Sequence, residues 1–276
     1  MPTPTTGVLP VPGARLYHEV RGSGPLLLLI ATGNGDATPY GPMADALADR
    51  YTVVTYDRRG FSRSPIEGPI DDAGRLAEDV ADAVALIDRF SGDPAYVYGA
   101  CSGATVALAL LERAPGRIRR LVAHEPPLAS VLPDAEKWSR FHKDLYDVYR
   151  ASGVAAAKEL FKGTLELGES RPPEDAVLPP DKLEELRERL RRNELFWFEH
   201  ELLPFPDEVI DLAALGAVSD RLVPAHGLDS ADGFPHTPIV VVAERLGLPL
   251  TGFPGAHLGH VTHPREFAAR LASLFR

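Results

Sequence analysis

The stretch around Cys101 has the residue types and spacing of a nucleophile held on a tight turn. Gly99 and Gly103 lie two residues on either side of Cys101, a β-rich run (Pro94–Tyr98) precedes the turn and an apolar run (Thr105–Leu111) follows it. A side chain at either glycine would hold the strand and the helix apart, and the central residue is exposed in a strained conformation at the helix N-terminus. The pattern predicts a cysteine nucleophile. The alternative is a structural turn with a buried, inert cysteine.

The segments that must position this turn alternate between strand and helix patterns. Strands are predicted at Ala14–Val20, Leu26–Ile30, Tyr51–Tyr56, Ile118–Ala123, Arg221–His226 and Leu248–Phe253. Helices are predicted at Tyr40–Arg50, Asp71–Phe90 and Pro238–Leu246, with a last helix from Pro264. This alternation predicts an α/β fold with a mostly parallel, doubly wound sheet.

Several polar side chains follow directly after predicted strands. Asn34, Asp57, Cys101 and Glu125 each lie just past such a strand end. Ligands of open parallel sheets bind outside the carboxyl ends of the strands. We therefore expect these four residues to converge on one site.

The strand pattern stops after Pro127. Residues 128–216 contain three candidate helices, at Asp134–Tyr149, Val154–Leu167 and Asp181–Leu203. We expect this region to be an inserted helical cap on a core formed by residues 1–127 and 217–276.

Composition narrows the possible partners. The 276 residues carry a formal net charge of -10, which argues against nucleic acid and anionic membranes as partners. A single cysteine excludes internal disulfides and CxxC zinc sites. No signal-peptide pattern is present in Met1–Pro12 and no apolar run approaches membrane-spanning length, so we expect a cytoplasmic protein without a membrane partner. Nothing in the sequence indicates the oligomeric state.

Taken together, these features resemble the α/β-hydrolase fold superfamily over nearly all of Gly13–Arg276, although the cap matches only in position. Four stretches carry the resemblance: Thr32-Gly33-Asn34, at the usual His-Gly-oxyanion position; Tyr56–Ser64, which looks like Asp-x-Arg-Gly-x-Gly-x-Ser with Ser62 replacing the second glycine; His226–Asp229, at the usual triad acid; and Gly255–His257, at the usual triad histidine. The chain order nucleophile, acid, histidine is also that of the family.

The resemblance implies a catalytic triad. Cys101 would be the nucleophile, His257 the base and Asp229 the acid that orients the base. Glu125 is the second candidate for the acid, because some members place it after that earlier strand. The structural alternative for Asp229 is a solvated turn residue.

The resemblance also implies an oxyanion hole made by the backbone amides of Asn34 and Ser102. Ser102 is not expected to be the nucleophile, since the turn exposes its neighbour. Cysteine in place of the usual serine is a feature shared with dienelactone hydrolases and polyhydroxyalkanoate synthases, which the rest of the chain does not resemble. An engineered serine-to-cysteine replacement is the alternative.

Two clusters of residues could suggest a metal site by their residue types, but neither has the arrangement that a metal ion needs. His257, His260 and His263 lie in a loop before a helix, without carboxylate or thiolate spacing that supports an ion. Adjacent residues on a helix do not face one another, so Glu199-His200-Glu201 is expected to form a capping or surface network. We expect neither a metal nor a cofactor.

The expected reaction is hydrolysis of an ester, lactone or thioester of a mid-sized hydrophobic small molecule through an acyl-thioester on Cys101. One alternative is an acyltransferase or cyclase that passes the acyl group from a carrier-bound or coenzyme A substrate to another nucleophile. Another is a non-hydrolytic pocket with a binding, isomerase or lyase role.

The substrate pocket is expected beneath the cap. Phe196, Trp197 and Phe198 would line an apolar chamber there, with Glu125 also at its edge. The equally favoured alternative is that these aromatic side chains only attach the cap to the core.

Overall fold

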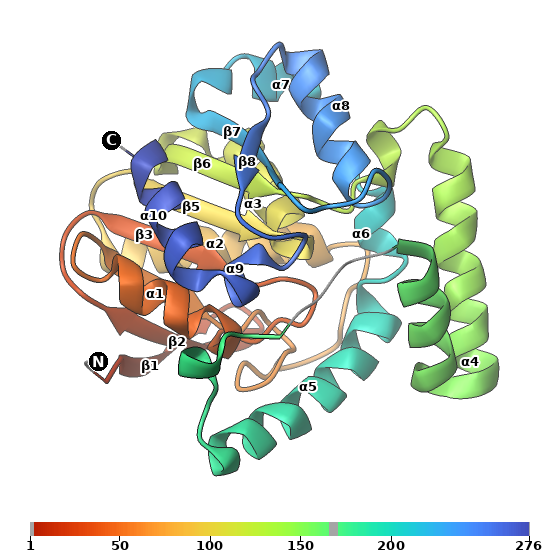
Figure 1. The fold of residues 1–276 in the computed structure, drawn as a ribbon, viewed down its shortest axis with the longest axis horizontal. Coiled ribbons are helices and arrows are strands. Elements are labelled where there is room, and N and C mark those ends of the chain that lie inside the picture. Colours follow the sequence, from red (N-terminus) through yellow and green to blue (C-terminus); the bar gives the residue numbers. More distant parts are fainter. Residues whose placement is uncertain (1–2, 166–170, 276) are drawn as a thin grey trace.

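The computed structural model describes residues 3–165 and 171–275 of the chain. Within these ranges eight strands form one sheet in the order β1-β2-β4-β3-β5-β6-β7-β8 (Figure 1). Their bounds are Thr5–Val11, Ala14–Arg21, Leu26–Ile30, Thr52–Tyr56, Ala95–Ala100, Ile118–His124, Leu222–Gly227 and Thr251–Phe253 for β1 to β8. β2 pairs antiparallel with β1 and β4, and all other neighbours are parallel. The predicted mostly parallel sheet is confirmed.

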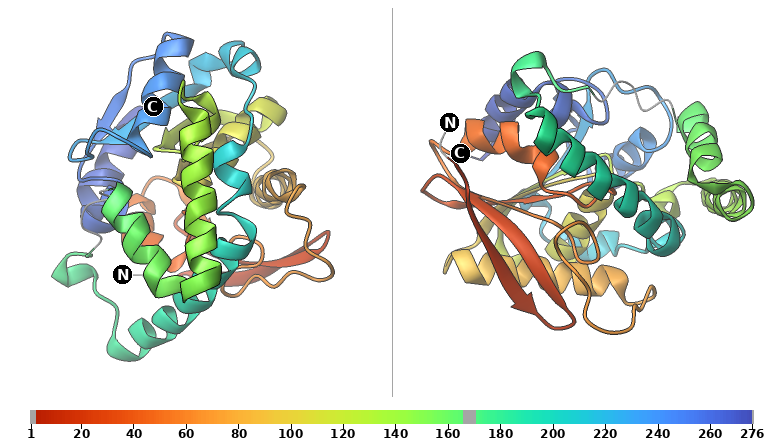
Figure 2. Two further views of the ribbon diagram at one scale, coloured as in Figure 1. Left: turned by 90° about the vertical axis from the view of Figure 1, so that its right-hand side faces the viewer. Right: turned by 90° about the horizontal axis from the view of Figure 1, so that it is seen from below.

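Ten α-helices surround this sheet in the described part of the chain. Their bounds are Gly41–Leu47, Arg75–Phe90, Ser102–Arg113, Ala135–Leu165, Pro180–His200, Pro204–Asp207, Leu212–Gly216, His236–Leu246, Gly259–Thr262 and Pro264–Leu274 for α1 to α10. Helices α1 and α10 cover one face of the sheet, and α2, α3 and α8 pack on the other (Figures 1 and 2).

The strand β3 shows why the central strands are apolar without alternation. All five of its side chains are buried. Leu27 and Leu29 pack in the cluster with α1 and α10, whereas Leu26, Leu28 and Ile30 pack in the cluster with α2 and α3. A strand buried on both faces carries apolar residues at every position, and this signal makes it readable from the sequence.

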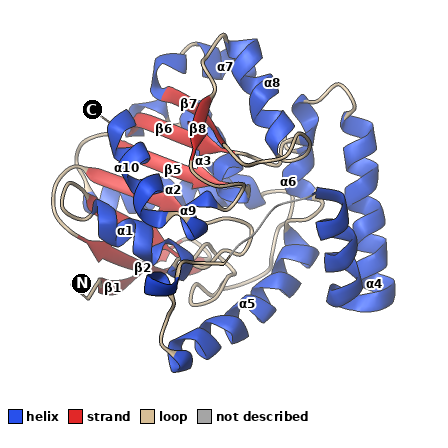
Figure 3. Cartoon of the chain, viewed as in Figure 1, coloured by secondary structure: helices blue, strands red, loops and turns tan. Residues whose placement is uncertain are grey.

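Between β6 and β7 the described residues form helices and no strand (Figure 3). The two predicted helices at Asp134–Tyr149 and Val154–Leu167 correspond to the two halves of α4, which Gly153 separates at a kink with the non-helical angles φ 83° and ψ 175°. Residues 166 and 167 of that prediction lie outside the described residues. Figure 1 shows α4 to the right of the sheet and α5 below it, outside the layers of the core. No helix in the described ranges combines the length and the apolar composition needed to cross a bilayer.

A buried charge network joins the helical segment to the core. Glu201 follows α5 and accepts two hydrogen bonds from Arg58. Nη1 donates to Oε2 at 3.1 Å, and Nη2 donates to Oε1 at 2.7 Å. Arg75 Nη2 lies 3.3 Å from the same carboxylate, and Asp79 accepts from Arg58 Nη2 at 2.7 Å. Glu201 is fully buried, so the expected surface network is wrong for this residue. Its charge is instead neutralised by arginines distant in sequence.

Candidate active site

The turn at Cys101 has the strained geometry that its sequence predicts. Cys101 lies between β5 and α3 with φ 53° and ψ −129°, and the residue is partly exposed. A Cβ on Gly99 would come within 2.2 Å of the Gly103 carbonyl oxygen, and a Cβ on Gly103 within 2.4 Å of the Ile30 carbonyl oxygen. Only glycine leaves room at these two positions, and the close packing presents the thiol at the N-terminus of α3.

His257 and Glu125 form a buried pair beside this thiol. The Nδ1–H of His257 donates to Glu125 Oε2 at 2.7 Å, which leaves Nε2 for Cys101. The backbone N–H of Gly227 donates to Glu125 Oε1 at 2.9 Å. Glu125 follows β6 directly, has a positive φ of 48° and is 0% exposed. Both oxygens of this carboxylate are therefore held in place by donors.

Asp229 does not reach His257, contrary to the preferred prediction for the acid. After β7 the chain turns to the surface at Leu228, which is 65% exposed, and Asp229 is exposed as well. The backbone N–H of Asp229 donates to Gly255, but its carboxylate has no hydrogen bond or ion pair within residues 3–165 and 171–275. Glu125, the second candidate, occupies the expected position.

The three groups shift one another's proton affinities. Burial raises the pKa of the Cys101 thiol, but the charge of His257 and its hydrogen bond outweigh burial, so the net pKa is lowered. Burial lowers the pKa of His257, but Cys101 and Glu125 outweigh it and raise the pKa to about 10. Burial also raises the pKa of Glu125, and the neighbouring histidines reverse this and hold it well below its usual range. These directions favour a thiolate–imidazolium pair backed by a carboxylate.

The backbone donors near the sulfur differ from the predicted pair. Hydrogen bonding from the amides of Ser102 and Gly33 contributes to the lowered pKa of Cys101, behind burial and His257. The amide of Asn34 lies instead 3.5 Å from the hydroxyl of Thr32. The amides of Ser102 and Gly33 thus lie beside the sulfur, whereas that of Asn34 does not. Gly33 follows a buried strand, and a glycine there indicates that the backbone closely approaches another group. The sequence prediction nevertheless assigned the oxyanion donor to the next residue, Asn34.

The remaining strand-end residues do not join the thiol. Asp57 accepts from the backbone N–H of Ala37 at 2.8 Å and from Arg63 Nε at 2.6 Å, so it holds two loops together. The carbonyl oxygen of Asn34 accepts from Asn193 of α5 at 2.7 Å. Of the four residues expected to converge, Cys101 and Glu125 meet through His257, and the other two position loops.

The three aromatic residues Phe196, Trp197 and Phe198 of α5 occupy different environments. A Cβ on Gly33 would come within 2.9 Å of Trp197 Nε1, so the partly exposed indole lies against the loop beside Cys101. Phe196 covers Gly60, where a Cβ would come within 2.1 Å of its ring. Phe198 is only 2% exposed and packs inside the helical segment. Trp197 therefore borders the candidate site, while the other two attach the helices to the core and to one another.

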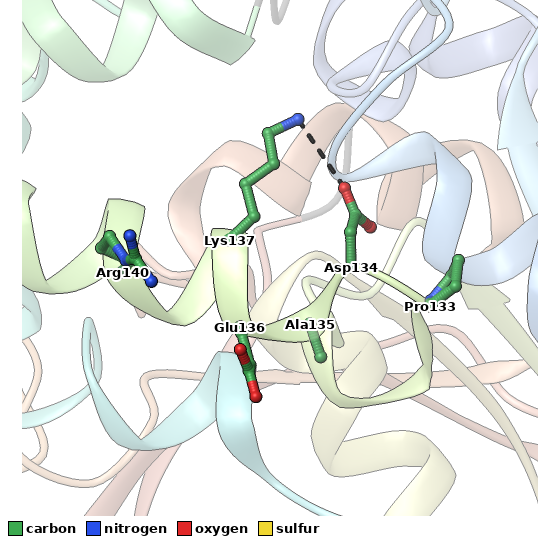
Figure 4. Close-up of a pocket in the computed structure, with 6 residues that line it drawn as sticks. All are labelled: Pro133, Asp134, Ala135, Glu136, Lys137 and Arg140. Atoms are coloured by element: carbon green, nitrogen blue, oxygen red, sulfur yellow. Dashed lines mark ion pairs between the residues drawn. The ribbon is translucent and has the colours of Figure 1, made fainter.

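Two surface hollows lie away from this centre. The first is lined by Pro133 to Lys137 and Arg140 at the start of α4, with Lys137 Nζ 3.7 Å from Asp134 (Figure 4). The second is lined by Ser130, Val131, Val209–Leu212 and Arg245. Neither lining contains a cysteine or a histidine.

A group of described residues that could hold a metal ion includes Glu125, the partner of His257. Glu125, His226 and His236 each offer one ligand atom, and these atoms lie within 4.8 Å of one another. Sequence reasoning missed this group, because its members lie on three separate elements.

Comparisons with known proteins identify the fold family of the chain. Residues 25–177 match the family model of the alpha/beta hydrolase fold. The chain is 34% identical to an "uncharacterized hydrolase YraK" of Bacillus subtilis (strain 168) over 98% of this chain and 95% of that one. It is 28% identical to a zearalenone hydrolase of Cladophialophora bantiana, over 95% and 92% of the two chains. A crystal structure of an alpha/beta hydrolase from Sphaerobacter thermophilus superposes with a TM-score of 0.69 at 22% identity, covering 98% of this chain and 100% of that one. The chain belongs to the alpha/beta hydrolase fold family.

Proposed function

We propose that this enzyme hydrolyses an ester or lactone of a mid-sized apolar molecule through a covalent thioester on Cys101. The observation that carries the proposal is the pairing of His257 with the buried Glu125 beside a thiol held on a strained turn. An activated nucleophile, a base in reach and a group that orients the base are the requirements for covalent acyl transfer. In this proposal Glu125 takes the role that the sequence assigned to Asp229.

The first half of the reaction forms the acyl-enzyme. The Cys101 thiolate attacks the substrate carbonyl carbon, and the electron pair moves to the carbonyl oxygen. The amides of Gly33 and Ser102 are placed to stabilise this oxyanion. When the intermediate collapses, the carbon–oxygen bond to the leaving group breaks and the His257 imidazolium protonates the departing oxygen.

The second half regenerates the enzyme. Neutral His257 takes a proton from water as the water attacks the thioester carbonyl. Collapse of this second tetrahedral intermediate breaks the carbon–sulfur bond, releases the acid and restores the Cys101 thiolate beside the imidazolium. Glu125 keeps the imidazole oriented and stabilises its positive charge in both halves. No step requires a metal or a cofactor.

The substrate class rests on the walls around the thiol. We assign residues 128–216 the role of a cap and Trp197 that of an apolar wall, since its indole lies against Gly33. An aromatic ring in the wall suits an apolar acyl or alcohol moiety. One relative is named a zearalenone hydrolase, so zearalenone is the first defined compound for this site to be tested with.

The test is turnover of p-nitrophenyl esters and zearalenone by the wild type, Cys101→Ala and Cys101→Ser. We expect Cys101→Ala to lose most of its turnover, because Ser102, the neighbouring hydroxyl, is buried and is not presented by the turn. Cys101→Ser should retain measurable turnover, since the hydroxyl occupies the same place and His257 can act as its base. Full activity in a folded Cys101→Ala protein would contradict the proposal and favour a non-covalent role for the pocket.

Added amines and alcohols distinguish hydrolysis from acyl transfer. We expect the acid to remain the main product in their presence. Predominant transfer of the acyl group to the added nucleophile would assign the acyl-enzyme to an acyltransferase instead.

A further inference from the structure

Glu125 faces two histidines on the side away from Cys101. His226 is the fifth residue of β7, and His236 is the first residue of α8. Their ring centroids are 5.0 Å apart, and His236 Nδ1 lies 3.6 Å from Glu125 Oε1. One ligand atom from each residue lies within 4.8 Å of the other two. Three separate segments thus bring two imidazoles and a carboxylate to one point.

One nitrogen of each imidazole lacks a hydrogen bond in the described part of the chain, although His236 Nδ1 faces Glu125 Oε1 at 3.6 Å. The Nδ1 atoms of His226 and His236 are both buried, and neither has a hydrogen-bond partner among the described residues. Buried polar atoms are rarely left unsatisfied in native proteins, and an ion or an ordered water is a usual reason for an exception. The side chain of His236 is 13% exposed, so a small ligand can reach the group from solvent.

The donor set fits a borderline-soft divalent ion. Neutral imidazole nitrogens and a carboxylate oxygen are zinc ligands, at about 2.0–2.2 Å from the metal. Ligand atoms around a tetrahedral zinc are then about 3.3–3.6 Å apart, so side-chain adjustments of about 1 Å would close the observed group on an ion. Water would complete the fourth position.

We propose that Glu125, His226 and His236 form a zinc-binding site that inhibits the enzyme. Zinc on Glu125 Oε1 would compete with the Gly227 N–H and withdraw negative charge from the carboxylate that faces His257. The carboxylate would then stabilise the imidazolium less, and formation of the acyl-enzyme would slow. The inhibitory consequence rests on the proposed function, whereas the binding site does not.

Binding is tested directly in metal-free Cys101→Ala protein, which removes the thiolate as a competing ligand. We expect calorimetry to show one Zn²⁺ bound per chain, and Co²⁺ to give visible d–d absorption of a low-symmetry site with nitrogen ligands. His226→Gln and His236→Gln, each in this background, should weaken Zn²⁺ binding by about 100-fold or more. Even groups that only hydrogen-bond to a metal ligand cost about 10–100-fold in affinity when they are removed.

The matched control is His200→Gln in the same background. His200 Nδ1 lies 2.8 Å from Asp72, which makes a histidine–carboxylate pair without a second histidine. This variant should bind Zn²⁺ as tightly as its parent. Circular dichroism checks the fold of each variant, and anomalous scattering from a zinc-soaked crystal locates the ion without any of these substitutions.

The outcomes separate the two proposals. The site is supported if Cys101→Ala binds zinc, if either histidine substitution abolishes this binding, and if the ion lies beside Glu125. This support does not depend on which reaction the wild type catalyses. No binding by Cys101→Ala, or an ion located away from Glu125, would overturn it. In the wild type, zinc should slow ester turnover, and His226→Gln should raise the inhibiting zinc concentration at least about tenfold. Binding beside Glu125 without any inhibition would refute the inhibitory role.

Discussion

Glu125 and Glu201 are both fully buried glutamates, but their partners differ in kind. The carboxylate of Glu125 meets His257 and a backbone amide, whereas that of Glu201 meets the guanidinium groups of Arg58 and Arg75. An imidazole exchanges its proton near neutral pH and a guanidinium does not. A buried carboxylate can therefore support proton transfer in the first region, while in the second it can only fix structure.

The second region, which we call the joint, consists of Arg58, Arg75, Asp79 and Glu201, and its balanced charges suit a structural contact. Arg58 and Arg75 offset Asp79 and Glu201, so the four buried charges sum to zero. Burial lowers the pKa of Arg58, but the two carboxylates outweigh it and raise the pKa above its ordinary value. The joint connects the loop after β4, helix α2 and the segment after α5. Its expected role is to hold α5, and with it Trp197, above the site.

Glu125→Gln is the substitution with the largest expected effect on activity. A neutral amide cannot stabilise the His257 imidazolium, and its NH₂ group can favour the wrong tautomer. We expect kcat/KM for ester hydrolysis to fall by about 10²–10⁴-fold, with a folded protein by circular dichroism. Asp229→Asn is the control and should stay within about twofold of the wild type. A large loss in Asp229→Asn beside an active Glu125→Gln would reverse the assignment of the acid.

Glu201→Gln should act mainly on stability. Removing this carboxylate leaves a net positive charge buried among Arg58, Arg75 and Asp79. Breaking a buried pair in this way costs about 3–5 kcal/mol in the free energy of unfolding, which urea denaturation measures.

The control for that joint is Glu199→Gln, two residues earlier. Glu199 is exposed and pairs with Tyr149 and Arg150 at the surface. Its loss should cost less than about 1 kcal/mol. Equal effects of the two substitutions would show that the buried network does not hold the helical segment in place.

A smaller effect is expected for the aromatic side chains carried by α5. Trp197→Ala should lower kcat/KM for bulky apolar esters about tenfold more than for acetyl esters, because the lost wall contacts only the larger substrates. Phe198→Leu, inside the helical segment, should lower the free energy of unfolding by about 1 kcal/mol and leave the ratio between the two esters unchanged. An unchanged ratio in Trp197→Ala would remove this residue from the substrate site.

Much of the fold could be predicted because its signals are local. Continuous apolar runs marked the central strands, and the glycines around Cys101 marked the turn. The exception is β1, whose side chains are exposed or half-buried and carry no continuous apolar run. Its stability comes from antiparallel pairing with β2, from Thr5↔Val20 to Val11↔Ala14. Pairing between strands is not visible in either segment alone.

The site was predictable in its residue types but not in its pairings. Glu125 and Asp229 both follow strand ends, so spacing could not decide between them. Which carboxylate meets His257 depends on the direction of the chain after each strand. Glu125 turns inward with a positive φ, whereas Asp229 lies at the surface. The expected surface position of Glu201 was wrong for a similar reason, because its partners lie more than a hundred residues earlier in the chain.

The central claim is that Cys101 carries the acyl group during turnover. Rapid acid quench of the enzyme with a p-nitrophenyl ester, followed by intact-protein and peptide mass spectrometry, tests it most directly. The account predicts a mass increase of one acyl group, located on Cys101, absent from Cys101→Ala and formed more slowly in Glu125→Gln. Product formation without an adduct on Cys101, or with the acyl group on Ser102 instead, would contradict it.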